Sequence, residues 1–276
     1  MTMGAQHEAE LQARKIRELV LRCVCHAGAG HTGGALSIVE ILTALYFHVL
    51  RIDPANPQWP ERDRFILSKG HAAVALYAAL AARGYFGEAL MEEFDRLDSC
   101  LQGHPDMLKT PGVDMSTGSL GQGLSAGIGM ALAARKLGLG FHTYVLLGDG
   151  ELQEGQVWEA AMYAGFNKVR RLVAIVDYNK LQLTGRTEAT LDIEPLADKW
   201  RAFRWRTIEC DGHCLPEVIA SLEKARDRSE EGPVVIIAHT HKGHGVSFIC
   251  DRVEWHAKAP SAEELRVALA ELGVAE

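Results

Sequence analysis

Apolar and polar residues alternate along the chain with two different periods. Apolar residues spaced three or four apart predict helices over residues 11–25, 38–50, 72–83, 154–166, 195–203 and 215–228. Short segments, some of them nearly continuous apolar runs, predict strands over residues 65–68, 142–147, 172–178, 204–209 and 234–238. Ser37 is expected to cap the second of these helices.

Strands alternate with helices through most of the chain, which predicts an α/β fold. Repeated strand–helix–strand units give a parallel sheet with helices on both faces. The runs "LVAIVDY" and "PVVIIAHT" suit strands that are buried on both faces. Without a repeat or a linker, residues 1–276 are expected to form a single domain. Ligands of such sheets bind beyond the carboxyl ends of the strands.

Composition and charge narrow the class of protein. Of 276 residues, 47% are hydrophobic and 24% charged, which is typical of a soluble globular protein. The net charge of -7 argues against nucleic acid or an anionic membrane as the main partner. The N-terminus lacks the pattern of a signal peptide, and no apolar run approaches the ~18 residues of a membrane span. A cytoplasmic location is therefore expected.

Neither the cysteines nor the first glycine cluster predicts a site of its own. The six cysteines are expected to be reduced thiols, because Cys210 and Cys214 fall short of the four ligands of a structural zinc site. The segment 28–33 matches the dinucleotide fingerprint, and Asp53 follows at about the right distance. That fingerprint requires a preceding strand, whereas the pattern here predicts a helix.

An acidic turn follows the strand predicted over residues 142–147. Asp149 comes directly after this strand, and Asn179 follows the next predicted strand, so adjacent parallel strands would bring the two side chains together. Their oxygens suit Mg²⁺ or Ca²⁺, and Mg²⁺ usually bridges to a phosphate. Asp149 could equally be the cap of a helix. From this local pattern alone the two interpretations are balanced.

Four histidines lie beside glycines or turns rather than on apolar helix faces. They are His31, His71, His104 and His256. Isolated histidines are usually surface or core residues, but four in such positions favour a shared polar site. The glycine-rich segment 118–129 opens a helix whose N-terminus suits an anion, or it serves close helix packing.

These segments together resemble a known family. "GDGELQEGQVWEA" followed by "IVDYNKLQL" resembles the thiamine diphosphate motif that begins with GDG and ends in asparagine. "GHTGG", "LSKGHAAVALY", "LQGHPD", "TGSLGQGLS", "HKGHGVSF" and "WHAKAP" resemble the transketolase version. The chain is similar to the N-terminal, diphosphate-binding half of transketolase, with the thiamine-diphosphate-binding fold.

The resemblance implies a role for individual residues near the cofactor. Asp149, Asn179 and the Leu181 carbonyl match metal ligands, and Gly150 and Asn179 match groups that contact the diphosphate. Three further residues match positions around the diphosphate and the thiazolium: His71, Lys242 and His256. The loop beside the cofactor rings corresponds to Gly118, Ser119 and Leu120.

The resemblance also implies catalytic residues. His31, His104 and His256 match residues that hydrogen-bond substrate hydroxyls and move protons. Glu154 matches a carboxylate in a proton network that links two active sites across an interface.

The chain departs from the family at a few positions. Val74 stands where proline is frequent, and Lys180 where glycine is common, so a positive φ at Lys180 would carry strain of about 1 kcal/mol or more. His239, His241 and His244 cluster beside Lys242. This H-x-H-x-x-H run suits a transition metal, or it consists of solvated loop histidines.

The implied activity is reversible transfer of a two-carbon ketol unit from a ketose (phosphate) to an aldose (phosphate), in the pentose phosphate pathway of carbohydrate metabolism. The implied cofactors are thiamine diphosphate and Mg²⁺, with Ca²⁺ as the alternative ion. The pyrimidine-binding domain is expected on a separate C-terminal subunit, in an α2β2 heterotetramer. The alternatives are the α subunit of another thiamine enzyme, such as a 2-oxo acid dehydrogenase, and a non-catalytic cofactor-binding regulatory subunit.

Overall fold

A five-stranded parallel sheet forms the centre of the computed structural model, which describes residues 2–274. Its strands run in the order β1-β2-β3-β7-β6. They are β1 (Arg64–Leu67), β2 (Thr143–Gly148), β3 (Leu172–Tyr178), β7 (Val234–His239) and β6 (Arg206–Asp211). All four pairings are parallel, so the predicted parallel sheet is confirmed.

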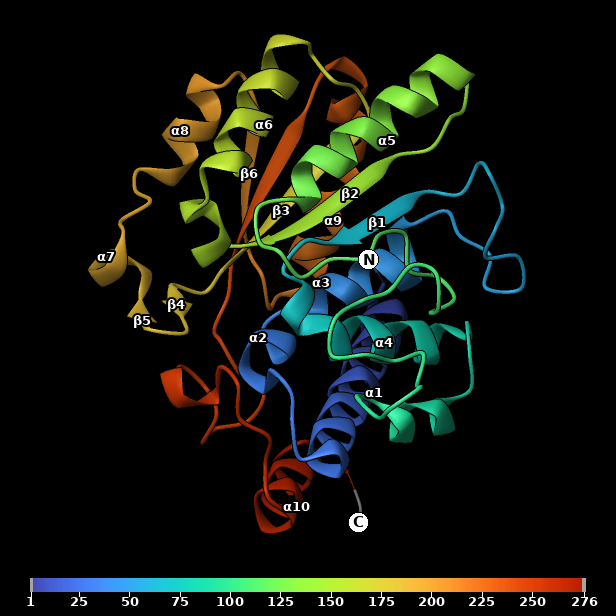
Figure 1. Cartoon of the computed structure of the whole chain (residues 1–276), viewed down its shortest axis with the longest axis vertical. Helices are drawn as coiled ribbons and strands as arrows, with labels where there is room; N and C mark the ends of the chain where they lie inside the picture. Colours follow the sequence, from blue (N-terminus) through green and yellow to red (C-terminus); the bar gives the residue numbers. More distant parts are fainter. Residues whose placement is uncertain (1, 275–276) are drawn as a thin grey trace.

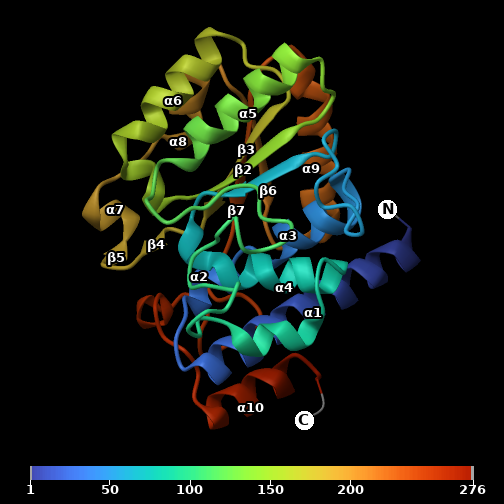
Figure 2. The same ribbon diagram turned by 45° about the vertical axis from the view of Figure 1, so that its right-hand side comes forward.

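Helices cover both faces of this sheet (Figures 1 and 2). One face packs against α1 (Met3–Ala27), α3 (Val39–Ala44), α4 (Ala73–Arg83) and α9 (Leu215–Arg228). The other packs against α5 (Gly123–Leu137), α6 (Gly155–Phe166) and α8 (Leu196–Ala202). The helix α10 (Ala262–Glu271) lies beside α1, away from the sheet.

The alternation of side chains along each strand explains these two layers. In β3, Val173 and Ile175 belong to the core under α1, whereas Ala174 and Val176 belong to the core under α5 and α6. Every residue of β3 is buried, as expected for a central strand of a parallel sheet.

Short elements complete the chain, and most of them lie near the carboxyl ends of the strands. They are α2 (Thr32–Leu36), η1 (Leu45–Val49), η2 (Gly70–Ala72), η3 (Glu88–Glu93), η4 (Gly150–Gln153), β4 (Leu181–Gln182), β5 (Gly185–Arg186), α7 (Thr187–Thr190), η5 (Ser229–Glu231) and η6 (Val253–Trp255). The register pairs Gly148 with Asp177, so the residues after β2 and β3 meet at one edge.

Two local predictions need correction. The helix predicted over residues 38–50 is instead α3 followed by the π-helical turn η1. Ser37 does not cap it: its hydroxyl donates hydrogen bonds to the Gly34 carbonyl and to the buried carboxylate of Asp177. A tertiary partner thus replaced the local capping bond.

The dinucleotide fingerprint is rejected by the structure as it was by the sequence. Helix α1, not a strand, precedes it, and Gly28 ends that helix in the left-handed conformation. Within residues 2–274, no helix is both long and apolar enough to cross a membrane.

Candidate functional site

A cavity of about 370 Å³ opens at the carboxyl ends of β2 and β3. Most of the residues singled out from the sequence line it: His31, His71, Gly118, Leu120, Asp149, Gly150, Glu154, Asn179, Leu181, Lys242 and His256. Residues from distant parts of the chain therefore converge as the parallel sheet requires.

Asp149 follows the carboxyl end of β2, and its side chain is buried. Its Oδ1 accepts a hydrogen bond from the Gly150 amide at 2.7 Å, and its Oδ2 accepts one from the Lys180 amide. Burial and the neighbouring carboxylate of Asp177 raise the pKa of Asp149 to about 7. A cation bound beside this carboxylate would stabilise its charged form. The capping interpretation also holds in part, because Asp149 is the N-cap of η4.

Asn179 and Leu181 follow the carboxyl end of β3, the strand next to β2. The Asn179 amide nitrogen donates to Asp177 at 2.9 Å, and its oxygen accepts from the Leu181 amide at 3.0 Å. Lys180 between them has a φ of 63°, so the left-handed conformation that carries strain in a non-glycine residue is present. This conformation accompanies the bond between the Lys180 amide and Asp149.

A buried ion pair beneath these residues was not recognised as functional from the sequence. Lys69 Nζ lies 2.6 Å from Asp177 Oδ2, and the Ser37 and Thr240 hydroxyls also donate to Asp177. Burial alone would raise the pKa of Asp177, but the Lys69 charge and these donors hold it below its usual value. The signal was an aspartate within a wholly apolar strand.

Glu151 is a second residue whose role the sequence did not reveal. Its Oε1 accepts from the Gly121 amide at 2.9 Å and from the Ser68 hydroxyl, and its Oε2 accepts from the Gly148 amide at 3.0 Å. Although burial raises its pKa, these bonds oppose that shift. Glu151 therefore ties the loop before α5 to the ends of β1 and β2.

Three of the histidines that line the cavity form a cluster. The ring centroids of His31 and His71 lie 5.2 Å apart, those of His71 and His256 5.2 Å, and those of His31 and His256 5.6 Å. Burial and nearby cationic groups lower the pKa of His71 to about 2 and that of His256 to about 3. Burial also lowers the pKa of His31. All three are therefore neutral near pH 7.

Lys242 connects this cluster to the metal-ligand candidates. Its ammonium lies 2.6 Å from His256 Nδ1 and 3.1 Å from the Leu181 carbonyl oxygen. Because the ammonium donates to Nδ1, the proton of neutral His256 resides on Nε2. Burial and the charge of Lys69 lower the pKa of Lys242 to about 8.

The remaining predicted residues lie at the outer margin. His104 and Ser119 line a neighbouring pocket that shares Gly118 with the main cavity, and the His104 ring lies 6.4 Å from that of His31. Glu154 is exposed at the start of α6, and Ser119 and Leu120 are exposed beside it. Exposed positions at the rim are available to a partner chain.

The donor set fits a divalent cation and a diphosphate. Asp149, Asn179 and the Leu181 carbonyl supply hard oxygen ligands, and that carbonyl keeps a second lone pair beside Lys242. Lys242 adds a positive charge at the same cavity, and the Lys69 ammonium, which also lines it, is paired with Asp177. The buried Gln182 Oε1, also at the cavity, has no protein partner within the described chain.

The histidine run 239–244 does not converge on one metal. His239 pairs with the exposed Glu209, and His241 pairs with Asp251. His244 instead stacks on His213. Cys210 and Cys214 are free thiols, and neither belongs to a metal-like group of side chains in residues 2–274.

Comparison with known proteins gives the family. The model of the thiamine diphosphate-binding domain of transketolase matches residues 8–276. The 6-deoxy-6-sulfo-D-fructose transketolase subunit SqwG of Clostridium sp. (strain MSTE9) is 48% identical over 267 residues, which cover 97% of both chains. An apulose-4-phosphate transketolase subunit of Actinobacillus succinogenes is also 48% identical over 267 residues, 96% of both chains.

Solved transketolases have the same fold. Transketolase from Pichia stipitis superposes with a TM-score of 0.92 at 30% identity, over 96% of this chain and 41% of that one. This chain thus spans less than half the length of that enzyme. The relatives favour transketolase over a 2-oxo acid dehydrogenase subunit. The fold and the family expected from the motifs are both confirmed: the chain belongs to the transketolase family of transferases and corresponds to its thiamine diphosphate-binding domain.

Proposed function

We propose that this chain is the diphosphate-binding subunit of a two-subunit transketolase, which transfers a two-carbon ketol unit between sugars. The observation that carries the proposal is the single cavity that joins three oxygen ligands, two lysines and three neutral histidines. The relatives called transketolase subunits match this chain over nearly their entire length, which supports a separate pyrimidine-domain partner.

In this proposal the oxygens of Asp149, Asn179 and Leu181 hold a divalent cation, Mg²⁺ by preference, which neutralises the diphosphate. Lys69 and Lys242 add positive charge on the same side. Gly150 and the Gly118–Leu120 loop let backbone approach the ligand. Thiamine diphosphate would supply the carbanion chemistry that breaks and forms the carbon–carbon bond.

The histidines act on the sugar. Neutral His31 and His256 can each donate a hydrogen bond from the ring nitrogen that carries the proton, whereas His71 faces the diphosphate and the thiazolium. His256 presents Nε2–H as the donor, because Nδ1 faces Lys242. His104, at the rim, would contact the sugar further from the reacting carbon. Glu154 would meet its counterpart across an α2β2 interface.

The substrate class follows from the relatives. Their names specify a sulfonated fructose and a phosphorylated apulose, both of which carry an anionic group. We therefore infer a ketose donor with an anionic group, in cytoplasmic carbohydrate metabolism; the pentose phosphate pathway is the default setting.

The test is a ketol-transfer assay with thiamine diphosphate and Mg²⁺. Xylulose 5-phosphate and a sulfonated ketose serve as donors, and ribose 5-phosphate as acceptor. The chain is assayed alone and then with a co-expressed pyrimidine-domain subunit. Turnover that requires both subunits is expected. Turnover by the chain alone would refute the two-subunit arrangement, and no turnover with the bound partner would favour the non-catalytic alternative.

A further inference from the structure

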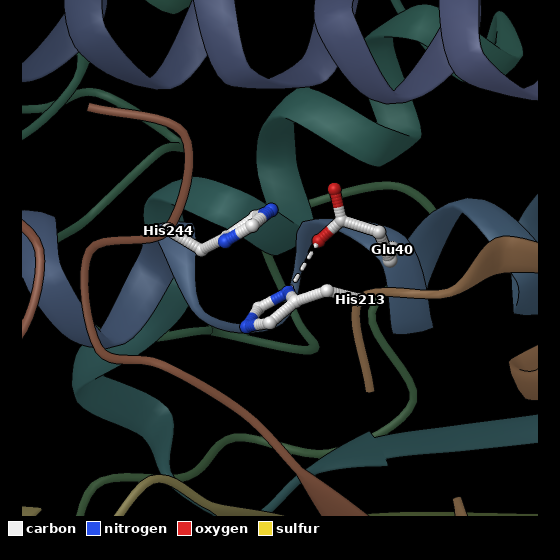
Figure 3. A group of neighbouring side chains, drawn as sticks. All are labelled: Glu40, His213 and His244. Carbon is white, nitrogen blue, oxygen red and sulfur yellow. Dashed lines mark hydrogen bonds and ion pairs between the residues drawn. The ribbon is translucent and has the colours of Figure 1, made fainter. Parts of the chain in front are cut away.

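A cluster of two buried and two half-buried side chains joins four segments that are distant in sequence. It consists of Arg17 on α1, Glu40 on α3, His213 after β6, and His244 after β7. The His213 and His244 rings stack with centroids 3.6 Å apart, and Figure 3 shows them beside the Glu40 carboxylate. Glu40, His213 and His244 each offer one potential ligand atom, and these atoms lie within 4.8 Å of one another, as in a metal site.

The hydrogen bonds argue against a metal. His213 Nε2 accepts from the His241 amide at 2.7 Å, so Nδ1 carries the proton, and Nδ1 lies 3.1 Å from Glu40 Oε2 (Figure 3). A metal ligand would need the lone pair at Nδ1 that this proton occupies. The other Glu40 oxygen lies 2.5 Å from the Arg17 guanidinium, which repels a cation.

Glu40 instead acts as a clamp between two hydrogen-bond donors. The side chains of Arg17 and Glu40 are 7% and 6% exposed, and that of His213 is 8% exposed. Burial alone would raise the pKa of Glu40, but Arg17 and His213 lower it to about 2. The carboxylate therefore stays charged and holds both donors.

Arg17 and His213, which both bind Glu40, also form hydrogen bonds with the loop that carries Lys242. His213 accepts from the amide of His241, the residue before Lys242. Arg17 Nε donates to the carbonyl of His244, two residues after it, at 3.1 Å. The Arg17 side chain also packs on Gly245, where an added β carbon would lie 2.6 Å from it. The loop is thus fixed on both sides of Lys242.

We propose that Glu40, through Arg17 and His213, is a positioning residue that fixes Lys242 at the Leu181 carbonyl and at His256. The clamp follows from the contacts within this chain alone. Its catalytic consequence rests on the proposed function, in which Lys242 faces the diphosphate.

Hydrogen exchange measured on the purified chain tests the clamp without cofactor or partner. In His213→Ala the segment 240–251 is expected to exchange about tenfold faster, while the strands of the sheet keep their protection. His213→Gln offers an amide oxygen to the His241 amide and should restore part of that protection. His239→Gln, at the exposed end of β7, is the matched control and should change nothing in this segment.

Histidine NMR links the clamp to the cavity. Burial and, after it, the charge of Lys242 lower the pKa of His256 to about 3, so a displaced Lys242 in His213→Ala should let that pKa rise. Glu40→Gln should have the same effect if the variant folds. The proposal is overturned if the 240–251 segment is unchanged in His213→Ala, if all strands lose protection equally, or if the pKa of His256 does not move.

A Zn²⁺ titration addresses the rejected alternative directly. Wild type is expected to bind no Zn²⁺ that depends on Glu40 and His213; such binding would contradict the clamp. Failure of the ketol-transfer assay alone would leave these results intact, because none of them requires turnover.

Discussion

Lys69 Nζ lies 2.6 Å from Asp177 Oδ2 at the cofactor cavity, and the two side chains are 2% and 0% exposed. Asp177 also accepts a hydrogen bond from the Asn179 amide nitrogen. The pair therefore sets the orientation of Asn179, whose amide oxygen is a proposed metal ligand. The Asp177 carboxylate thus has two roles: it forms the ion pair with Lys69, and it orients the side chain of Asn179.

Breaking this pair from one side should be costly. Lys69→Met or Asp177→Asn alone leaves a buried group without its counter-charge, which costs about 3–5 kcal/mol of unfolding free energy. The double variant removes both charges and should lose less than the sum of the single losses. Urea unfolding of the four proteins at pH 7 measures this coupling.

An exposed pair provides the control for that cycle. Arg186 and Glu188 have side chains 56% and 60% exposed, so removal of either should cost less than about 1 kcal/mol. Additive losses for Lys69 and Asp177 would show that the two groups act independently and would refute the shared role.

Asp149→Asn should abolish the metal-dependent part of cofactor binding. The change keeps the shape of the side chain but removes the negative charge that the cation requires. In the complex with the partner subunit, Mg²⁺ and thiamine diphosphate at 100 times their Kd should stabilise wild type by about 2.7 kcal/mol and the Asp149→Asn variant far less. Differential scanning calorimetry with and without ligands measures the difference.

Asp198→Asn on α8 is the matched control, since that carboxylate is exposed and pairs only with Arg201 among the described residues. It should retain the full ligand-induced stabilisation. An equal shift in Asp149→Asn and wild type would remove Asp149 from the metal site.

The sequence predicted the sheet well because its signals are local. A strand was predicted at each position of the central sheet, most clearly for the apolar runs of β3 and β7, and their succession placed Asp149 and Asn179 at the carboxyl ends of neighbouring strands. The positions of four histidines beside glycines or turns favoured a shared polar site, but the sequence alone could not show that they converge. Their convergence depends on loops whose paths no local pattern determines.

Pairs of buried polar side chains could not be predicted from the sequence, because no local pattern shows which distant residues meet. Lys69 and Asp177 are 108 residues apart, and neither has a periodic signature. The H-x-H-x-x-H run suggested a local site, yet His244 pairs with His213 from another strand end. Ser37 likewise exchanged a local cap for Asp177. The partner of a buried polar side chain depends on which segments the tertiary structure brings together.

Two helical glycines should respond in opposite directions to alanine. At Gly165 in α6, a β carbon would lie 1.7 Å from the Phe203 carbonyl oxygen, so Gly165→Ala should destabilise the chain by about 2 kcal/mol or more. At Gly129 in α5, no atom lies within 4 Å, so Gly129→Ala should stabilise it by about 0.5–1 kcal/mol. Urea unfolding compares both with wild type. Equal effects would contradict the packing of α6 on the Phe203 turn.

The low pKa of His71 makes a prediction about pH. Burial and nearby charges hold its pKa at about 2, against 6.5 in the unfolded chain. Between these values the unfolded chain binds a proton that the folded chain does not. Stability should therefore fall as pH drops below 6.5, by about 1.4 kcal/mol per pH unit from this residue.

His71→Asn keeps a polar side chain but cannot take up that proton, so its unfolding free energy should decline less steeply between pH 6.5 and pH 4 than that of wild type. Urea midpoints across this range give the two slopes, and the imidazole NMR signals of wild type should show His71 neutral at pH 4. If His71 titrates near pH 6.5, or if the two slopes coincide, its pKa is not lowered in the folded chain. Burial of the His71 ring would then not lower its pKa, and its contribution to the pH dependence of stability would be refuted.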